Sequence, residues 1–199
     1  MKKRLLFAVA LLASATGAFA QGVKVRGVLG MGLTFGGDTL ASARYDSSSS
    51  YGSDNVKIHA GGLIAFNGGV EVQFTDLVSS QVLISYHADR ANASNGSIRF
   101  ERYPLEVLGH FRANNWFRLG GGLRYTDSAK LRASGAGTGY ASNEDFKPSY
   151  GSVVEGEFFP LQSWGIKLRY VSEKFRSKTN LQRADVDGSH GGVYFNYYF

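Results

Sequence analysis

The chain has 199 residues, a formal net charge of +6 and no cysteine. The lack of cysteine excludes a disulfide framework and a thiolate metal site. The charge is mild, since without the three basic residues at positions 2–4 the remaining 19 basic residues face 16 acidic ones. Such a balance does not indicate nucleic-acid binding, which is typically marked by a clustered basic stripe.

The first 20 residues have the three parts of an export signal. Lys2, Lys3 and Arg4 are cationic, residues 5–12 are apolar, and Ala18-Phe19-Ala20 fits a cleavage site. The apolar run is too short for a transmembrane helix, which needs about 20 apolar residues. We therefore predict a signal peptide at residues 1–20 and a single domain at residues 21–199.

A two-residue period then dominates the sequence. Apolar and polar residues alternate, as expected for strands with one face toward lipid. The predicted strands are residues 23–35, 56–75, 81–89, 102–112, 116–126, 150–159, 164–173 and 193–199. Polar segments 37–55, 127–148 and 176–190 are expected to be long loops and 90–97 a short one, with turns at 75–80, 113–115 and 160–163.

This pattern predicts an all-β fold, an antiparallel eight-stranded transmembrane β-barrel. Bacterial barrels of this kind have an even strand number, short periplasmic turns and longer outer loops. A soluble barrel would carry its charges outside, whereas here they share the face opposite the apolar band. The lumen of such a barrel is just wide enough for side chains to fill.

The inward face carries charges of both signs, which must pair when they are away from water. The predicted interior network comprises Arg26, Lys57, Glu71, Glu106, Arg118, Arg124, Glu155, Glu157, Lys167 and Arg169. A turn centred near Gln162 places Glu157 opposite Lys167, and Glu155 opposite Arg169. We expect a salt-bridged plug rather than the alternative, a pathway for protons or ions.

The last strand carries an alternating apolar series that ends in an aromatic residue: Val193, Phe195, Tyr197 and Phe199. This resembles the closing strand of bacterial outer-membrane barrels. Together with the strand pattern, it makes the domain similar to the small eight-stranded outer-membrane barrels of the OmpA and OmpX type. The resemblance implies location in the bacterial outer membrane, contact with outer-membrane lipids and lipopolysaccharide, and insertion by the barrel-assembly machinery, which recognises the terminal motif.

A structural or surface-interaction role through the outer loops is the expected function. One alternative is a narrow conduit for small hydrophobic molecules, like OmpW-type barrels, with apolar inward residues at Leu63, Leu83, Leu108, Val153 and Val171. The other is a lipid A-modifying enzyme, but no histidine begins the His-x-Ser-Asn motif that the deacylases of this kind carry. We expect no catalytic residues, cofactor, metal or nucleic-acid partner.

Overall fold

The computed structural model describes residues 23–44, 55–93, 96–139, 141–178 and 185–199. The predicted signal peptide lies outside these residues. The described part of the chain contains no helix that is long and apolar enough to cross a membrane.

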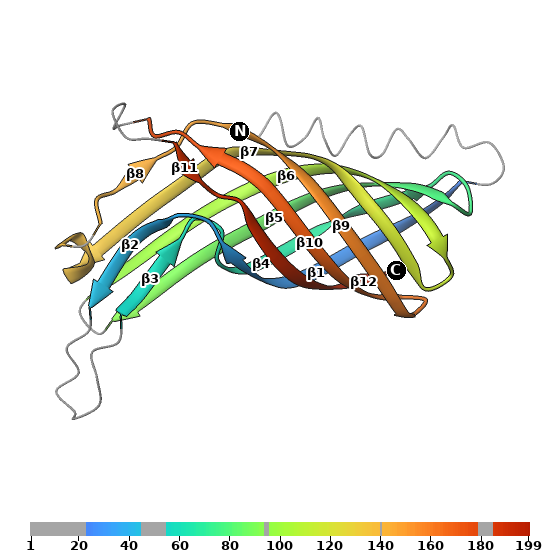
Figure 1. Cartoon of the computed structure of the whole chain (residues 1–199), viewed down its shortest axis with the longest axis horizontal. Coiled ribbons are helices and arrows are strands. Elements are labelled where there is room, and N and C mark those ends of the chain that lie inside the picture. Colours follow the sequence, from blue (N-terminus) through green and yellow to red (C-terminus); the bar gives the residue numbers. More distant parts are fainter. Residues whose placement is uncertain (1–22, 45–54, 94–95, 140, 179–184) are drawn as a thin grey trace, which may run out of the picture.

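Eight strands form a closed antiparallel barrel, which confirms the predicted fold class. They are β1 (Lys24–Gly36), β4 (Leu63–Gln73), β5 (Val78–Ala93), β6 (Gly96–Asn114), β7 (Phe117–Gly135), β9 (Ser149–Leu161), β10 (Trp164–Phe175) and β12 (His190–Tyr198). Each pairs with its neighbour in this order, and β12 closes the barrel against β1, with Met31 opposite Phe195. Figure 1 shows that the strands run obliquely to the long axis of the barrel, as closure of a barrel requires.

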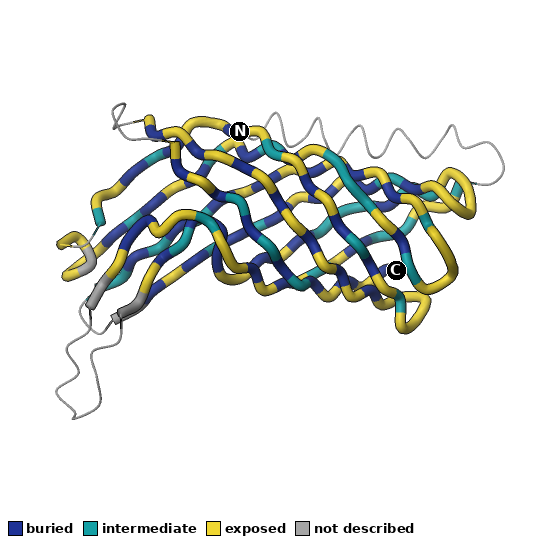
Figure 2. The backbone as a smooth tube through the Cα atoms, viewed as in Figure 1, coloured by how far each residue is buried: buried dark blue, intermediate teal, exposed yellow. Residues whose placement is uncertain are grey.

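Buried and exposed residues alternate along the barrel strands (Figure 2). The exposed face is apolar over a continuous band, which includes Leu29, Met31, Leu33, Val107, Leu119, Leu123, Val154, Leu168 and Phe195. In water, exposure of so large an apolar surface would be unfavourable by about 25 cal/mol per Å². The band is therefore the lipid-facing surface that the two-residue period predicted.

The two ends of the barrel differ. The short turns at residues 74–77, 115–116 and 162–163 lie at one end, together with the C-terminus, where the Tyr198 amide donates to the Ser163 carbonyl. Short turns are periplasmic in barrels of this type, so the opposite end is extracellular. Exposed Trp116 and Trp164 mark the periplasmic rim, and the paired rings of Tyr125 and Tyr150 mark the extracellular rim.

Much of what the sequence analysis assigned to loops is strand. β6 and β7 have 19 residues each, whereas a tilted strand crosses a membrane in about 9–11. The predicted loop at 90–97 is strand at 90–93 and 96–97, so that prediction was wrong there, and residues 94–95 lie outside the described residues. The segment at 127–148 also contains the end of β7, a short 3-10 helix at Ala136–Gly139 and β8 (Glu144–Asp145). The predicted loop at 176–190 includes β11 (Val186–Asp187), which pairs with β10.

The predicted strand at 56–75 is two strands. β3 (Asn55–His59) pairs with β2 (Thr39–Arg44) in a separate two-stranded sheet, and only β4 belongs to the barrel. Lys57 is exposed on this outer sheet, so its predicted place in the lumen was wrong. Leu63, at the start of β4, is also exposed and does not line the lumen.

The extended strands enclose a core of their own beyond the membrane band. This outer apolar cluster comprises Leu40, Ala41, Ile58, Ala60, Ala91, Ile98, Phe100, Ala129, Leu131, Ala133, Phe146, Phe175 and Val186. At its centre the rings of Phe100, Phe146 and Phe175 meet edge to face, with centroids 5.7–6.1 Å apart. Edge-to-face packing of this kind stabilises aromatic clusters beyond simple burial. The cluster thus holds the β2–β3 hairpin and the ends of β5, β6, β7 and β10 together as one extracellular body, which we call the extracellular sheet.

The lipid-facing band predicts the effect of a charge near its centre. Leu168→Arg should lower the free energy of unfolding in lipid bilayers by about 2–4 kcal/mol, the cost of an arginine at the bilayer midplane. Gln162→Arg, in the exposed periplasmic turn, is the matched control and should cause almost no loss. Equal losses for both variants in urea titrations would show that Leu168 does not face lipid.

The closing strand predicts a defect in assembly rather than in stability. The backbone of Phe199 bonds to Gly27 across the β12–β1 seam, while its ring is exposed to lipid. Phe199→Ala keeps the backbone bonds, so the purified variant should refold normally, whereas less heat-modifiable barrel should reach the outer membrane of cells. Phe111→Ala, at a position on β6 that is also exposed, should leave cellular assembly intact. Normal cellular amounts of the Phe199 variant would contradict the role of the terminal motif.

Candidate functional site

The lumen is organised by a single chain of alternating charges. In spatial order it runs Arg26, Glu71, Arg118, Glu157, Lys167, Glu155, Arg169, Glu106, Arg124 and Glu173, each within salt-bridge distance of the next. We call it the ion-pair chain. Basic and acidic side chains alternate along its whole length, so every internal member has two counter-charges.

The periplasmic third of the ion-pair chain is also held by many hydrogen bonds. Arg118 reaches Glu71 at 2.5 Å and Glu157 at 2.6 Å. Its guanidinium also donates to the Tyr198 hydroxyl at 2.6 Å. Asn196 on β12 donates to Glu157 at 2.9 Å, and Glu71 accepts from Gln81 on β5 at 2.7 Å. Asn196 and Tyr198 from β12 thus bond to Glu157 Oε1, which the cations leave open, whereas Gln81 from β5 shares Glu71 Oε2 with Arg118.

Glu155 lies at the middle of the ion-pair chain. Its carboxylate lies 2.6 Å from the Lys167 ammonium and 2.7 Å from the Arg169 guanidinium. Lys167 lies at a longer 3.9 Å from Glu157, although the two are direct cross-strand neighbours. The sequence-derived register of the β9–β10 hairpin is thus confirmed, while the shortest contact of Lys167 is to the diagonal carboxylate.

The extracellular third of the ion-pair chain joins the three strands β6, β7 and β10. Arg169 contacts Glu106 at 2.7 Å, and Arg124 bridges Glu106 at 2.9 Å and Glu173 at 3.1 Å. Glu173 also accepts hydrogen bonds from Thr126 and Ser149. Buried carboxylates that are paired and hydrogen-bonded in this way hold their charge without contact with bulk water.

The structure brings nine of the ten predicted network residues together in the ion-pair chain. The exception is Lys57, for the reason given above. Glu173 was missed, although it has the same parity on its strand as Lys167 and Arg169. The C-terminal series lies on the outer face of β12, where Phe195, Tyr197 and Phe199 are exposed and Val193 is half-buried.

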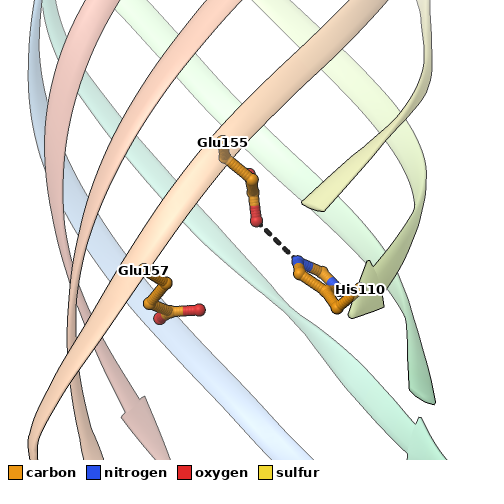
Figure 3. Close-up of side chains that lie close together, drawn as sticks. All are labelled: His110, Glu155 and Glu157. Carbon is orange, nitrogen blue, oxygen red and sulfur yellow. Dashed lines mark hydrogen bonds and ion pairs between the residues drawn. The ribbon is translucent and has the colours of Figure 1, made fainter. Parts of the chain in front are cut away.

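One cluster within the lumen has the composition of a metal site. Single donor atoms of His110, Glu155 and Glu157 lie within 4.8 Å of one another, and His110 Nε2 is 2.7 Å from Glu155 (Figure 3). However, these carboxylates already contact Lys167, Arg169 and Arg118, so a divalent cation would be added beside three positive charges. This cluster is better explained as part of the ion-pair chain.

A sizeable hollow of the lumen lies at its periplasmic mouth. It has a volume of about 870 Å³ and is lined by Lys24, Arg26, Gln73, Asp76, Arg112, Asn115, Phe159, Pro160, Leu161 and Gln162. Phe159 packs on Tyr198 with ring centroids 5.5 Å apart, and the Arg118 guanidinium lies 4.9 Å from its centroid. The hollow therefore ends where the ion-pair chain begins.

Apolar side chains occupy part of the lumen beside the charges. Leu83, Leu108, Val153 and Val171 are fully buried, as predicted for an inward position. They form a second cluster with Val28 and Tyr198. Charged and apolar side chains thus share the interior rather than forming a continuous apolar path.

A second polar group lies where the lumen meets the outer apolar cluster. Arg102 donates to the Ala60 carbonyl and contacts His87 Nδ1 at 2.7 Å. His87 Nε2 is 2.7 Å from the Thr34 hydroxyl, and its ring meets that of His190 edge to face at 4.9 Å. The sequence analysis did not foresee this group, because nothing in the spacing of its residues predicts that β1, β5, β6 and β12 bring them together.

The connectivity of the ion-pair chain predicts how charge changes act. Glu155→Gln should lower the free energy of unfolding by about 3–5 kcal/mol, because Lys167 and Arg169 lose a buried counter-charge. If Glu155 and Arg169 formed an isolated cross-strand pair, exchanging their charges in the double variant Glu155→Arg with Arg169→Glu would restore the stability that a single charge change removes. In the ion-pair chain, however, the exchange places a glutamate beside Glu106 and an arginine beside Lys167, so we expect little recovery of stability.

Urea titrations in lipid bilayers measure both variants. The exposed pair Arg176 and Asp185, whose guanidinium and carboxylate are 2.9 Å apart, provides the control. Exchange of its charges should leave stability nearly unchanged. Full recovery in the Glu155 and Arg169 exchange would show that this pair acts independently of its neighbours.

We compared the sequence and the fold with those of known proteins. The outer membrane protein beta-barrel domain matches residues 5–199. The attachment invasion locus protein Ail of Yersinia pestis, solved with the heparin analogue sucrose octasulfate, has a similar fold, with a TM-score of 0.54 and 15% identity over 90% of this chain and 100% of that one. Neisserial surface protein A has a TM-score of 0.49 and 9% identity over 90% and 100% of the two chains. No curated protein sequence gives a significant match.

The match to the family spans nearly the whole chain and agrees with the closed barrel, its apolar outer band and its short turns at one end. The chain therefore belongs to the outer membrane protein beta-barrel family and is an eight-stranded barrel of the bacterial outer membrane.

Proposed function

We propose that this protein is a plugged barrel that acts as a structural or surface-interaction protein through its extracellular sheet. The observation that carries this proposal is the ion-pair chain, which occupies the lumen between the periplasmic mouth and the outer apolar cluster. A pore for polar solutes needs a water-filled lumen, as in the much wider porins, and an eight-stranded barrel has room for little beyond its own side chains.

The extracellular sheet supports the surface role. Strands β5, β6 and β7 continue well beyond the membrane band, and Figure 1 shows them projecting together with β2, β3 and β8 at the end away from the C-terminus. The outer apolar cluster gives this projection a packed core. A rigid projecting surface is suited to contact with other molecules, because little conformational entropy is lost on binding.

We further propose that the protein is not an enzyme and that its surroundings are outer-membrane lipids and lipopolysaccharide, with the barrel-assembly machinery as a transient partner. His59 is half-buried, and its backbone amide donates to Asp89. The other three described histidines, His87, His110 and His190, are buried among arginines, carboxylates and one another. A general base must lie within reach of a substrate, and these positions offer none a direct approach.

The plugged lumen predicts an electrically silent protein. Refolded protein in planar lipid bilayers should show no steady conductance above the baseline, whereas a sixteen-stranded porin prepared in parallel should conduct. Frequent discrete openings of defined size from the purified protein would contradict the plug.

A conduit for small hydrophobic molecules is the second candidate, and one feature favours it. A hollow of about 620 Å³ lies in the barrel wall, lined by Phe35, Leu119, Gly120, Val154, Glu155, Gly156, Leu168, Arg169, Tyr170, Gly191, Gly192 and Val193. The strands around it remain paired, for example Leu168 with Gly156 and Val193, so the wall has no lateral gap there. Uptake of a small hydrophobic dye into proteoliposomes at a rate above that of protein-free vesicles would favour the conduit.

A further inference from the structure

Three arginines stand in a row across the outer face of the extracellular sheet. Arg90 on β5 is directly opposite Arg99 on β6, and Arg99 is directly opposite Arg132 on β7. Their strand neighbours Ile98, Phe100, Leu131 and Ala133 are buried in the outer apolar cluster. By the alternation of a strand, the three arginine side chains therefore point outward, away from the barrel axis.

Nearby acidic groups hold the row in place. Arg99 contacts Glu101 at 3.2 Å, and Glu101 in turn accepts a hydrogen bond from the Tyr86 hydroxyl at 2.6 Å. Arg132 contacts Asp145 at 2.5 Å, and this guanidinium holds the pKa of the Asp145 carboxyl below its usual range. The Arg99 and Arg132 side chains nevertheless keep 41% and 37% of their surface exposed, so both can contact a ligand.

The height of the row above the lipid band is set by the strands. Tyr86 and Tyr103, whose rings are 5.3 Å apart, belong to the extracellular rim. Arg90 and Arg99 each lie four residues farther out along the same strands. At about 3.3 Å per residue and a tilt near 45°, the row lies roughly 9 Å above the rim. This is the level of the polar headgroups of the outer leaflet.

Like charges directly opposite one another destabilise a sheet. Glu101 and Asp145 offset part of the repulsion within this row, and a multivalent anion across the row would offset more of it. Arginine is well suited to such a ligand, because its planar fork binds phosphate through two parallel hydrogen bonds.

We propose that Arg90, Arg99 and Arg132 form a binding site for the phosphate groups of lipopolysaccharide in the surrounding outer leaflet. Lipopolysaccharide is preferred over a soluble polyanion because the row faces sideways, just above the lipid-facing rim. The inference deepens the proposed surface role and rests on it only in placing the working surface outside the barrel. Conductance tests the plug, and lipopolysaccharide binding tests the row, so either can fail alone.

Binding is measured on protein in phosphatidylcholine nanodiscs, titrated with fluorescently labelled rough-type lipopolysaccharide. The triple variant R90Q/R99Q/R132Q should bind at least about tenfold more weakly than the wild type, because three charge-assisted donors are lost. The control K147Q/K174Q/K178Q removes the same charge from exposed lysines elsewhere on the extracellular side and should weaken binding less than about threefold. Dephosphorylated lipopolysaccharide should bind the wild type as weakly as intact lipopolysaccharide binds the arginine variant.

Urea titrations of the same samples test whether the three arginines act only by stabilising the fold. Without lipopolysaccharide, the arginine variant should resist urea about as well as the wild type. The partly exposed ion pairs with Glu101 and Asp145 that it loses contribute little to stability, and repulsion within the row is removed as well. A less stable arginine variant, equal loss of binding in the two triple variants, or unchanged binding of the dephosphorylated form would each overturn the proposal. Tighter binding of a soluble sulfated oligosaccharide than of lipopolysaccharide would also overturn it, and would indicate a soluble partner instead.

Discussion

Buried charge must be compensated, and this constraint organises the interior of the barrel. The ion-pair chain meets it by alternation, since each internal member touches two opposite charges on other strands. Six of the eight barrel strands contribute charged members, and β5 and β12 contribute the neutral donors Gln81, Asn196 and Tyr198. A shift of any charged strand by one residue would turn its charges toward lipid. The chain thus specifies register as well as filling the lumen.

The same alternation explains how much the sequence could predict. A period of two residues, with charges on one face, was sufficient for the eight barrel strands and for the pairing of Glu155 with Arg169. It failed at Lys57, because apolar Ile58 and Ala60 face a protein core rather than lipid, and the period is identical in both cases. The extracellular sheet was missed for a related reason: its outer face is polar, so segments such as 90–97 have the composition of loops. The contacts among Thr34, His87 and Arg102 depend on the pairing of β1, β4, β5 and β6 into one curved wall and have no local sequence signal.

The membrane-spanning and extracellular parts of the barrel differ in which face of the strands is apolar. Within the membrane, outward residues are apolar and the inward residues include the whole ion-pair chain, whereas beyond the membrane the inward residues form the outer apolar cluster and the outward ones include Arg90, Arg99 and Arg132. The change occurs along single strands: Arg124 lies in the ion-pair chain, and Leu131 on the same strand lies in the outer apolar cluster. Because the strands are continuous, the rigid barrel fixes the height and direction of the extracellular surface. The row of Arg90, Arg99 and Arg132 is one consequence, since its alignment follows directly from the register of β5, β6 and β7.

The central claim is that the lumen is filled by arginines and lysine held between carboxylates, rather than by water. Solid-state NMR of the protein in lipid bilayers, with ¹⁵N-arginine and ¹³C-glutamate, tests this directly through distances between guanidinium nitrogens and carboxyl carbons. The account predicts that Arg169 shows short distances to both Glu155 and Glu106, and that its guanidinium protons exchange slowly with water. Rapid exchange, with no carboxylate within contact distance of Arg169, would contradict it.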